Sequence, residues 1–116
     1  MNIQQLKFDQ VRRLLGDTNA LRAINGPSDG WVRAIREALG LPVRALAARA
    51  GLSNTAALSA ERNESRGTIS INQLQRMAAA LDCELVYALV PRRDLGAVVD
   101  EQAEKLAREE ELGVAY

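Results

Sequence analysis

The chain has 116 residues, no histidine and one cysteine, and its fifteen basic side chains balance fifteen acidic ones. One compact domain is the natural count for this length. The counts exclude a disulfide framework, zinc sites built from Cys and His, and the Ser-His-Asp and Cys-His mechanisms. We therefore expect no cofactor, no bound metal and no enzyme activity. No apolar run approaches the ~20 residues of a membrane span, and residues 1–12 are too polar for a secretory signal. A soluble, cytoplasmic protein is expected.

The zero net charge hides an asymmetry along the chain. Residues 1–91 carry eleven basic and eight acidic side chains, a balance of +3, whereas residues 92–116 carry four and seven, a balance of −3. A mildly basic body with an acidic tail is compatible with a polyanionic partner, but it also fits two differently solvated surfaces. Charge alone leaves both interpretations open.

The composition favours helices, because alanine (19) and leucine (16) dominate. Apolar residues at helical spacing over residues 3–24 predict one helix, or two with a break at Gly16 and Asp17. Residues 25–30 are turn formers and mark a boundary. We therefore predict a mainly α protein in which residues 1–29 form an N-terminal helical arm.

Residues 30–83 predict a bundle of short helices. The first covers residues 31–39, with Trp31 in the core, and the second begins at Pro42 and ends at Gly51. Ser53 can N-cap a third helix over residues 54–62, and Ser70 can cap a fourth. Residues 63–69 are predicted to form a polar loop.

The segment after these helices changes pattern. It is a continuous apolar run that Pro91 stops, and it predicts a β-strand within residues 84–91. No second strand is predicted, so the backbone groups of this strand need a partner, and the same strand of a second copy can supply it about a two-fold axis. We therefore expect a homodimer, with the alternative that the segment extends the preceding helix. Residues 92–116 predict an acidic helix that Asp94 caps. The dimer-strand residues are Leu85, Val86, Tyr87, Ala88, Leu89 and Val90.

Two short helices joined by a tight turn with a glycine are typical of a helix-turn-helix. The spacing of Leu46, Ala47, Gly51, Ser53 and Glu61 resembles that of the Xre/phage-repressor family. The resemblance covers about half the chain. It implies a lambda-repressor-like helical bundle that binds double-stranded operator DNA.

A closer resemblance rests on GWVRAIREALG at residues 30–40 and LDCELVYALVP at residues 81–91. Together with the helical arm, these stretches are similar to the family called mobile mystery protein A. Members are small Xre-type regulators encoded beside a protein with a Fic/Doc domain. The resemblance implies an autoregulatory repressor that is also the antitoxin of a Fic/Doc-type toxin. The alternative is a protein-binding module that neutralises a partner enzyme and binds DNA poorly.

The family resemblance also implies roles for individual residues. Arg36 and Glu61 match an internal ion pair, with phosphate binding by Arg36 as the alternative. The base-reading positions fall on Asn54, Thr55 and Ser59, which can hydrogen-bond to base edges, unless Asn54 only caps the helix. Leu58 occupies an exposed position where a polar residue is more usual. It can contact a thymine methyl group, with a rotated helix as the alternative.

The candidate phosphate contacts are arginines, for which the alternative is a solvated helix face. Arg44 is the best placed, because it lies in the first turn of the second helix of the motif. This helix carries Val43 where a phosphate-binding Gln is common, and the next carries Ala57 and Ala60 where larger residues are usual. Both departures weaken the case for strong sequence specificity. The phosphate candidates are Arg33, Arg44, Arg49, Arg62 and Arg66.

Overall fold

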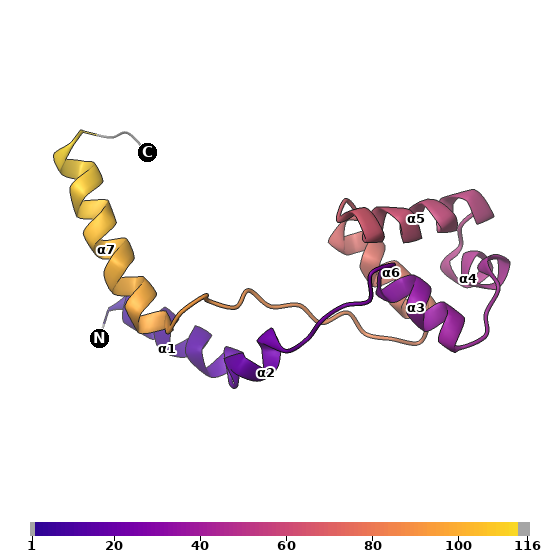
Figure 1. Cartoon of the computed structure of the whole chain (residues 1–116), viewed down its shortest axis with the longest axis horizontal. Helices are drawn as coiled ribbons and strands as arrows, with labels where there is room; N and C mark the ends of the chain where they lie inside the picture. Colours follow the sequence, from indigo (N-terminus) through magenta and orange to yellow (C-terminus); the bar gives the residue numbers. More distant parts are fainter. Residues whose placement is uncertain (1, 114–116) are drawn as a thin grey trace. The chain divides into compact units, whose positions relative to one another are not determined.

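The computed structural model describes residues 2–113, which form seven helices in two compact units (Figure 1). One unit consists of residues 25–87, and the other combines residues 1–24 with residues 88–116. Among the helices of residues 2–113, none has the length and apolar character needed to cross a membrane. The division brings the N-terminal arm and the C-terminal helix, which the sequence treats as separate segments, into the same unit.

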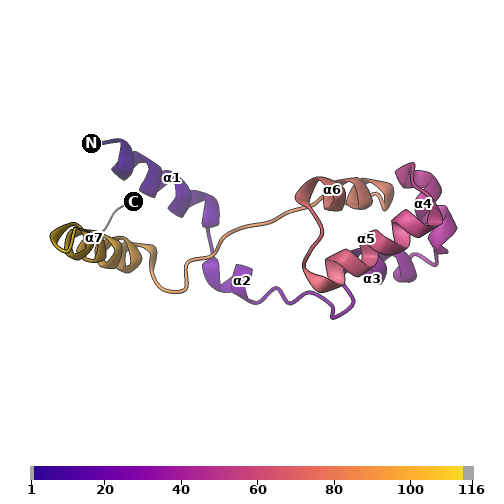
Figure 2. The same ribbon diagram turned by 90° about the horizontal axis from the view of Figure 1, so that it is seen from above.

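The unit of residues 25–87, the helix-turn-helix unit below, contains four helices that pack into one cluster (Figures 1 and 2). They are α3 (Trp31–Ala38), α4 (Val43–Ala50), α5 (Asn54–Arg66) and α6 (Ile71–Ala80). Their core contains Leu46 and Met77, which are fully buried, surrounded by small and aliphatic side chains. The other buried members of this cluster are Val32, Ala50, Ala60 and Leu81.

Local sequence explains where these helices begin. The Ser53 hydroxyl accepts a hydrogen bond from the backbone N–H of Ala56 at 3.1 Å, and the Ser70 hydroxyl accepts one from Gln73 at 3.1 Å. Each satisfies a backbone donor that the first turn of a helix leaves unpaired. Both N-caps are predicted from the sequence, and both are confirmed.

Helix α5 is longer than the sequence predicts. It continues through residues 63–66, which the sequence assigns to a polar loop, and it ends at Gly67. The φ of Gly67 is +74°, and the backbone N–H of Thr68 reaches back to the carbonyl of Asn63 at 2.8 Å. This left-handed glycine closes the helix one turn later than expected. The polar residues 63–66 are compatible with a helix because three of the four are exposed.

The core position predicted for Trp31 is wrong. Trp31 is the first residue of α3, and half of it is exposed. One edge of its indole ring lies against Gly26, where an added Cβ would come within 3.1 Å of the ring nitrogen. Trp31 follows the helical spacing of the apolar residues. Because it is the first residue of the helix, however, its ring lies at the edge of the unit.

The predicted strand does not form in the single chain. The described residues contain no β-strand, and residues 83–91 have neither helical nor sheet structure. The alternative, an extension of α6, is wrong too, because Asp82 adopts φ +57° and Cys83 donates its N–H to the carbonyl of Ala78 at 2.8 Å. That pairing is a Schellman-type helix end. With no second strand in residues 2–113 to pair with, the segment has no sheet to join.

The second unit, the terminal unit below, holds α1 (Ile3–Leu15), α2 (Thr18–Arg22) and α7 (Leu95–Glu111). Gly16 has φ +57° and ends α1, and Asp17 then caps α2, so the predicted break at these residues is confirmed. Asp94 caps α7 by accepting from the N–H of Ala97, also as predicted. None of the three helices contains a fully buried residue.

Candidate nucleic-acid interface

A tight turn joins α4 to α5. Gly51 adopts a left-handed conformation, with φ +69° and ψ +36°, and the N–H of Leu52 donates to the carbonyl of Ala47 at 2.8 Å. Ser53 then caps α5. A side chain at position 51 would strain this backbone, because L residues rarely adopt such a φ. The result is two short helices held in the geometry of a helix-turn-helix motif.

Arg76 of α6 stabilises the same turn from outside the motif. Its guanidinium donates to the carbonyl of Ala50 at 2.8 Å and to that of Gly51 at 3.2 Å. These carbonyls lie at the C-terminal end of α4, where backbone acceptors lack helical partners and the helix dipole favours a positive charge. Arg76 therefore acts as a side-chain cap on the first helix of the motif.

We expect Arg76→Met to lower the free energy of unfolding by about 1–2 kcal/mol. Hydrogen bonds to charged groups contribute about 1.5–3 kcal/mol, and the exposure of Arg76 lowers this value. Methionine keeps an apolar stem of similar length but cannot donate to the turn. Urea unfolding followed by the fluorescence of the single tryptophan, Trp31, measures the effect. Arg108→Met, on an exposed arginine of α7, is the matched control. Equal stability of the Arg76→Met and wild-type proteins would contradict the capping role.

The structure brings Arg36 and Glu61 together. The guanidinium of Arg36, on α3, donates two parallel hydrogen bonds to the carboxylate of Glu61, on α5, each at 3.0 Å. A third donor of Arg36 reaches the carbonyl of Leu41 at 2.9 Å. The two side chains are only 12% and 6% exposed. This bidentate pair locks α3 to the middle of α5 and consumes the donors that Arg36 would need to bind phosphate.

Glu64, one turn further along α5, makes a second connection to α3. Its two carboxylate oxygens accept from the backbone N–H groups of Trp31 and Val32, each at 2.8 Å. A carboxylate at a helix N-terminus satisfies free donors and complements the dipole. Gly30, with φ +92°, makes room for it, since an added Cβ would come within 2.7 Å of the Glu64 carboxylate. The orientation of α5 is therefore fixed at two successive turns.

The outer face of α5 carries the predicted base-reading residues. Asn54 and Thr55 are exposed in its first turn, Leu58 is 39% exposed one turn later, and Ser59 is half-buried. Ser53, not Asn54, provides the N-cap, so the Asn54 amide is not used in that role. Ala57 and Ala60 are buried on the opposite face. The face thus presents two polar side chains and one leucine at successive turns.

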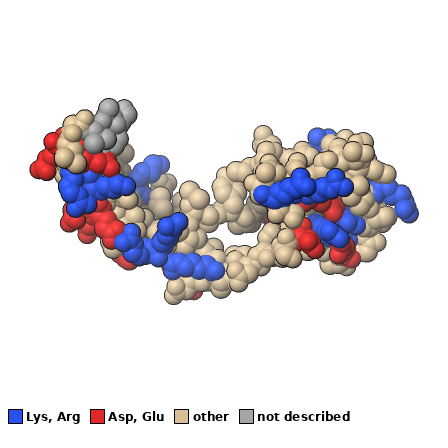
Figure 3. Space-filling model, turned by 45° about the horizontal axis from the view of Figure 1, so that its top comes forward, with Lys and Arg blue, Asp and Glu red and all other residues tan. Residues whose placement is uncertain are grey.

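Basic side chains dominate the helices of this unit. Residues 31–80 contain seven arginines and three glutamates, and Figure 3 shows a band of basic side chains on the visible face of the unit. All three glutamates are engaged, since Glu61 pairs with Arg36, Glu64 caps α3, and Glu37 pairs with Arg33 at 2.8 Å. Residues 31–80 therefore carry a net charge of +4, and Asp29, Asp82 and Glu84 reduce the net charge of the whole unit of residues 25–87 to +1.

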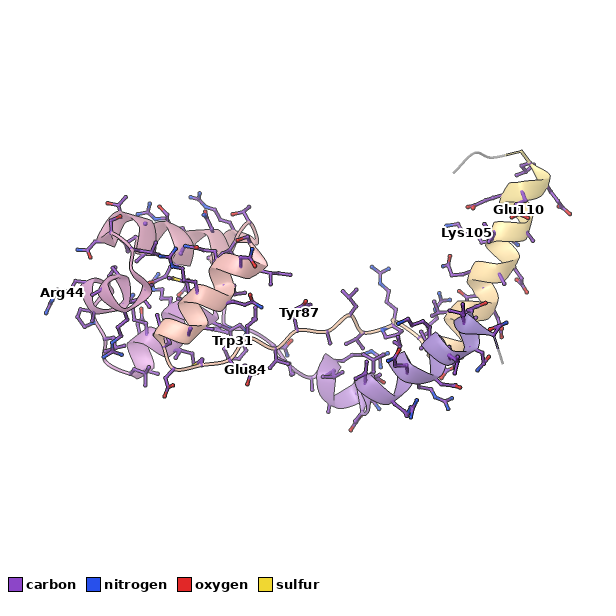
Figure 4. The ribbon with its side chains drawn as sticks, turned by 180° about the vertical axis from the view of Figure 1, so that it is seen from behind. Trp31, Arg44, Glu84, Tyr87, Lys105 and Glu110 are labelled. Atoms are coloured by element: carbon purple, nitrogen blue, oxygen red, sulfur yellow. The ribbon has the colours of Figure 1, made fainter. Side chains whose placement is uncertain are left out.

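The candidate arginines differ in their exposure and in whether an acidic side chain already binds them. Arg33 is engaged by Glu37, whose hydrogen bond and charge raise the pKa of the guanidinium further above its ordinary value. Arg44 extends into solvent from the first turn of α4 (Figure 4), and Arg49 is exposed at the end of that helix. Arg62 and Arg66 line a hollow of about 330 Å³ beside Leu58. Arg44, Arg49, Arg62 and Arg66 are therefore exposed to solvent, whereas Arg33 is paired with Glu37.

Sequence reasoning missed Glu64 and Arg76. Each binds backbone groups 25 to 33 positions away in the chain. No local spacing pattern signals such contacts, because the partner is a helix end and not a side chain. Only the position of Glu64, one helical turn after Glu61, hints that it lies near α3.

Comparison with known proteins agrees with this geometry. Residues 32–87 match the family model described as helix-turn-helix. No curated protein and no solved structure matches the chain. Residues 32–87, just under half of the chain, thus form a helix-turn-helix domain of the kind that DNA-binding transcription regulators carry.

Proposed function

We propose that the protein is a sequence-specific repressor that binds operator DNA through α5. The observation that carries the proposal is the exposed face of Asn54, Thr55 and Leu58, on a helix that two carboxylate contacts fix in place. A recognition helix held this firmly can enter the major groove, where its outward side chains read base edges. Ser59, which is half-buried, is proposed as a peripheral contact.

Exposed arginines are proposed to bind the DNA phosphates and so to position this helix on the duplex. Arg44 and Arg49 lie on α4, and Arg62 and Arg66 lie on the C-terminal half of α5, so they flank the reading face. Phosphate contacts fix the register of a protein on DNA and make its affinity fall with salt. Arg33 can contribute only if it leaves Glu37.

Fluorescence anisotropy with duplexes from the chain's own promoter tests the proposal. We expect binding with an operator preference of at least about 10³-fold over scrambled DNA, the lower end for specific regulators. We also expect a steep loss of affinity between 50 and 200 mM salt, by roughly 10³-fold or more if six or more phosphates are contacted. Equal affinity for operator and scrambled duplexes would contradict a sequence-specific repressor.

Asn54 is predicted to contribute specificity. We expect Asn54→Ala to cost about 1–3 kcal/mol on the operator and almost nothing on scrambled DNA, because an Asn amide can pair with both hydrogen-bonding groups of adenine. Asn63→Ala, an exposed asparagine near the other end of α5, is the matched control. An equal loss on both duplexes would assign Asn54 to the backbone instead.

We also propose that two copies pair through residues 84–90. Three observations on the single chain support the pairing. The segment has neither helical nor sheet structure, residues 2–113 contain no strand to pair with it, and Val86, Tyr87, Ala88 and Leu89 are exposed. Val86 is 81% and Leu89 91% exposed, and Figure 4 shows Tyr87 on this stretch. An antiparallel partner would satisfy the backbone and cover these residues. Tyr87→Pro, which removes one backbone donor, should raise the dimer dissociation constant, whereas Tyr87→Phe should leave it unchanged.

The resemblance to mobile mystery protein A supports a further role, in which the repressor is also the antitoxin of a Fic/Doc-type toxin. Co-expression with the neighbouring Fic-domain protein, where one is encoded, tests it. We expect the two proteins to co-purify and the growth arrest caused by the toxin to be relieved. Growth arrest that persists at equal expression would contradict the antitoxin role.

A protein-binding module with little DNA affinity is the second candidate. The observation that favours it is the leucine at the centre of the α5 outer face, next to a helix interior built from Ala57 and Ala60. Such a face offers few hydrogen bonds to bases. The same anisotropy experiment separates the candidates, because this module would bind operator and scrambled DNA weakly and alike.

A further inference from the structure

The terminal unit lacks a core of its own. Its helices α1, α2 and α7 contain no fully buried residue, in contrast to the helix-turn-helix unit with its cluster around Leu46 and Met77. Phe8 of α1 and Val99 of α7 line a shared hollow and are only half-buried. Short helices are marginal in water unless packing buries an apolar face. The unit therefore leaves apolar surface that a partner has to cover.

The uncovered surface follows one side of α1. Ile3, Leu6 and Leu14 are 80%, 56% and 80% exposed, and their spacing places them on a common face of the helix. By the same helical spacing, Lys7 and Arg13 flank this face. The side that carries Phe8 and Leu15 is better covered. Helix α1 thus presents an apolar stripe, interrupted by Gln10 between Leu6 and Leu14, between two positive charges.

Helix α7 presents the counterpart. Leu106 lies on the same side of the helix as Leu95 and Val99, with Gln102 between Val99 and Leu106, and it is 46% exposed. Glu110 lies one turn beyond Leu106 on the same side. In all, α7 carries six acidic and two basic residues, a charge of −4, whereas α1 carries three basic and one acidic residue, a charge of +2.

We infer that a second copy of this chain covers the surface, with α1 of each copy packed against the C-terminal half of α7 of the other. A two-fold interface must be self-complementary, and one unit here holds both an apolar stripe with positive flanks and an apolar row with negative charge. A partner surface that is only acidic would complement α1 but not α7, and one that is only basic would complement α7 but not α1. The inference does not depend on DNA binding, and it adds a second contact to the proposed pairing of residues 84–90.

Sedimentation equilibrium of the full chain tests the interface. We expect a wild-type dimer at micromolar concentration, and a dissociation constant raised at least about tenfold, or 1.4 kcal/mol, by Leu14→Glu. The matched control is Ile71→Glu, which changes an equally bulky, half-exposed residue in the first turn of α6 and should have no effect. A monomeric wild-type chain, or a Leu14→Glu dimer as tight as wild type, would overturn the inference. If Tyr87→Pro dissociates the dimer and Leu14→Glu does not, the dimer forms through residues 84–90 and not through α1 and α7.

A charge-exchange experiment keeps the inference testable if Leu14→Glu unfolds α1. One variant carries Lys7→Glu and Arg13→Glu, which makes both α1 and α7 acidic. The other carries Glu109→Lys and Glu110→Lys, which lie on either side of Leu106 and make α7 neutral beside a basic α1. Each variant alone should dimerise weakly. Their mixture should form a heterodimer, because the basic α1 of one variant then meets the acidic α7 of the other, and the acidic α1 meets an α7 whose negative charge has been removed. A mixture that dimerises no better than either variant alone would contradict the crossed arrangement.

Discussion

Glu61→Ala is expected to lower the free energy of unfolding by about 3–5 kcal/mol, because it leaves the Arg36 guanidinium buried without its carboxylate. That is a large fraction of the 5–15 kcal/mol that typically separates the folded and unfolded states. Urea unfolding monitored through Trp31 fluorescence measures the loss. The sequence places this pair on separate helices, so its removal should also loosen α5 and weaken any DNA binding.

The chain offers a matched control for this experiment. Arg33 and Glu37 form a second pair at a similar distance, 2.8 Å, but both side chains are about half exposed. Glu37→Ala should therefore leave the free energy of unfolding almost unchanged, as expected for an exposed pair one helical turn apart. Replacing both partners, as in Arg36→Met with Glu61→Leu, should recover much of the loss because no buried charge remains. Similar losses for Glu61→Ala and Glu37→Ala would contradict the structural role of the buried pair.

The largest expected effect on function comes from the exposed arginines. We expect Arg44→Ala to reduce the slope of log affinity against log salt by about one, and Arg44→Ala with Arg62→Ala and Arg66→Ala to reduce it by about three. Each neutralised phosphate accounts for about 0.9 log unit per decade of salt, so the triple variant should lose roughly 100- to 1,000-fold in affinity near 0.1 M salt. Anisotropy titrations at several salt concentrations measure both quantities.

An equal number of arginines outside this surface provides the control. Arg12→Ala, Arg93→Ala and Arg108→Ala remove the same total charge from the terminal unit. If only the arginines of the helix-turn-helix unit contact the phosphates, this control should lower the affinity for DNA slightly. The slope of log affinity against log salt should stay nearly unchanged. Equal slopes for the two triple variants would show that only net charge matters, and would remove the named arginines from the interface.

The features that could be predicted from the sequence are local. Ser53, Ser70 and Asp94 cap their helices as predicted, because an N-cap needs only a side-chain oxygen two or three positions before its donor. Gly51 takes the left-handed conformation for a similar reason, since the need for it arises within the turn itself.

The features that could not be predicted depend on contacts between distant residues. Glu64 and Arg76 bind helix ends that the fold alone brings near them. Trp31 follows the apolar period but lies at the rim, where the helix begins. The apolar run before Pro91 is β-prone, yet it stays unpaired in one chain, because a strand requires a neighbour that this sequence does not encode.

Hydroxyl-radical footprinting of the DNA upstream of the chain's own reading frame shows whether two copies of the protein bind one operator through α5. Two copies that present α5 to successive major grooves should protect two patches on one face of the duplex, with centres one helical turn, about 10 bp, apart or a multiple of it. The Arg44, Arg62 and Arg66 triple variant should lose both patches together. An absence of protection at concentrations that saturate the anisotropy signal, or a single protected patch without a symmetry-related second patch, would rule out operator binding by two copies through α5.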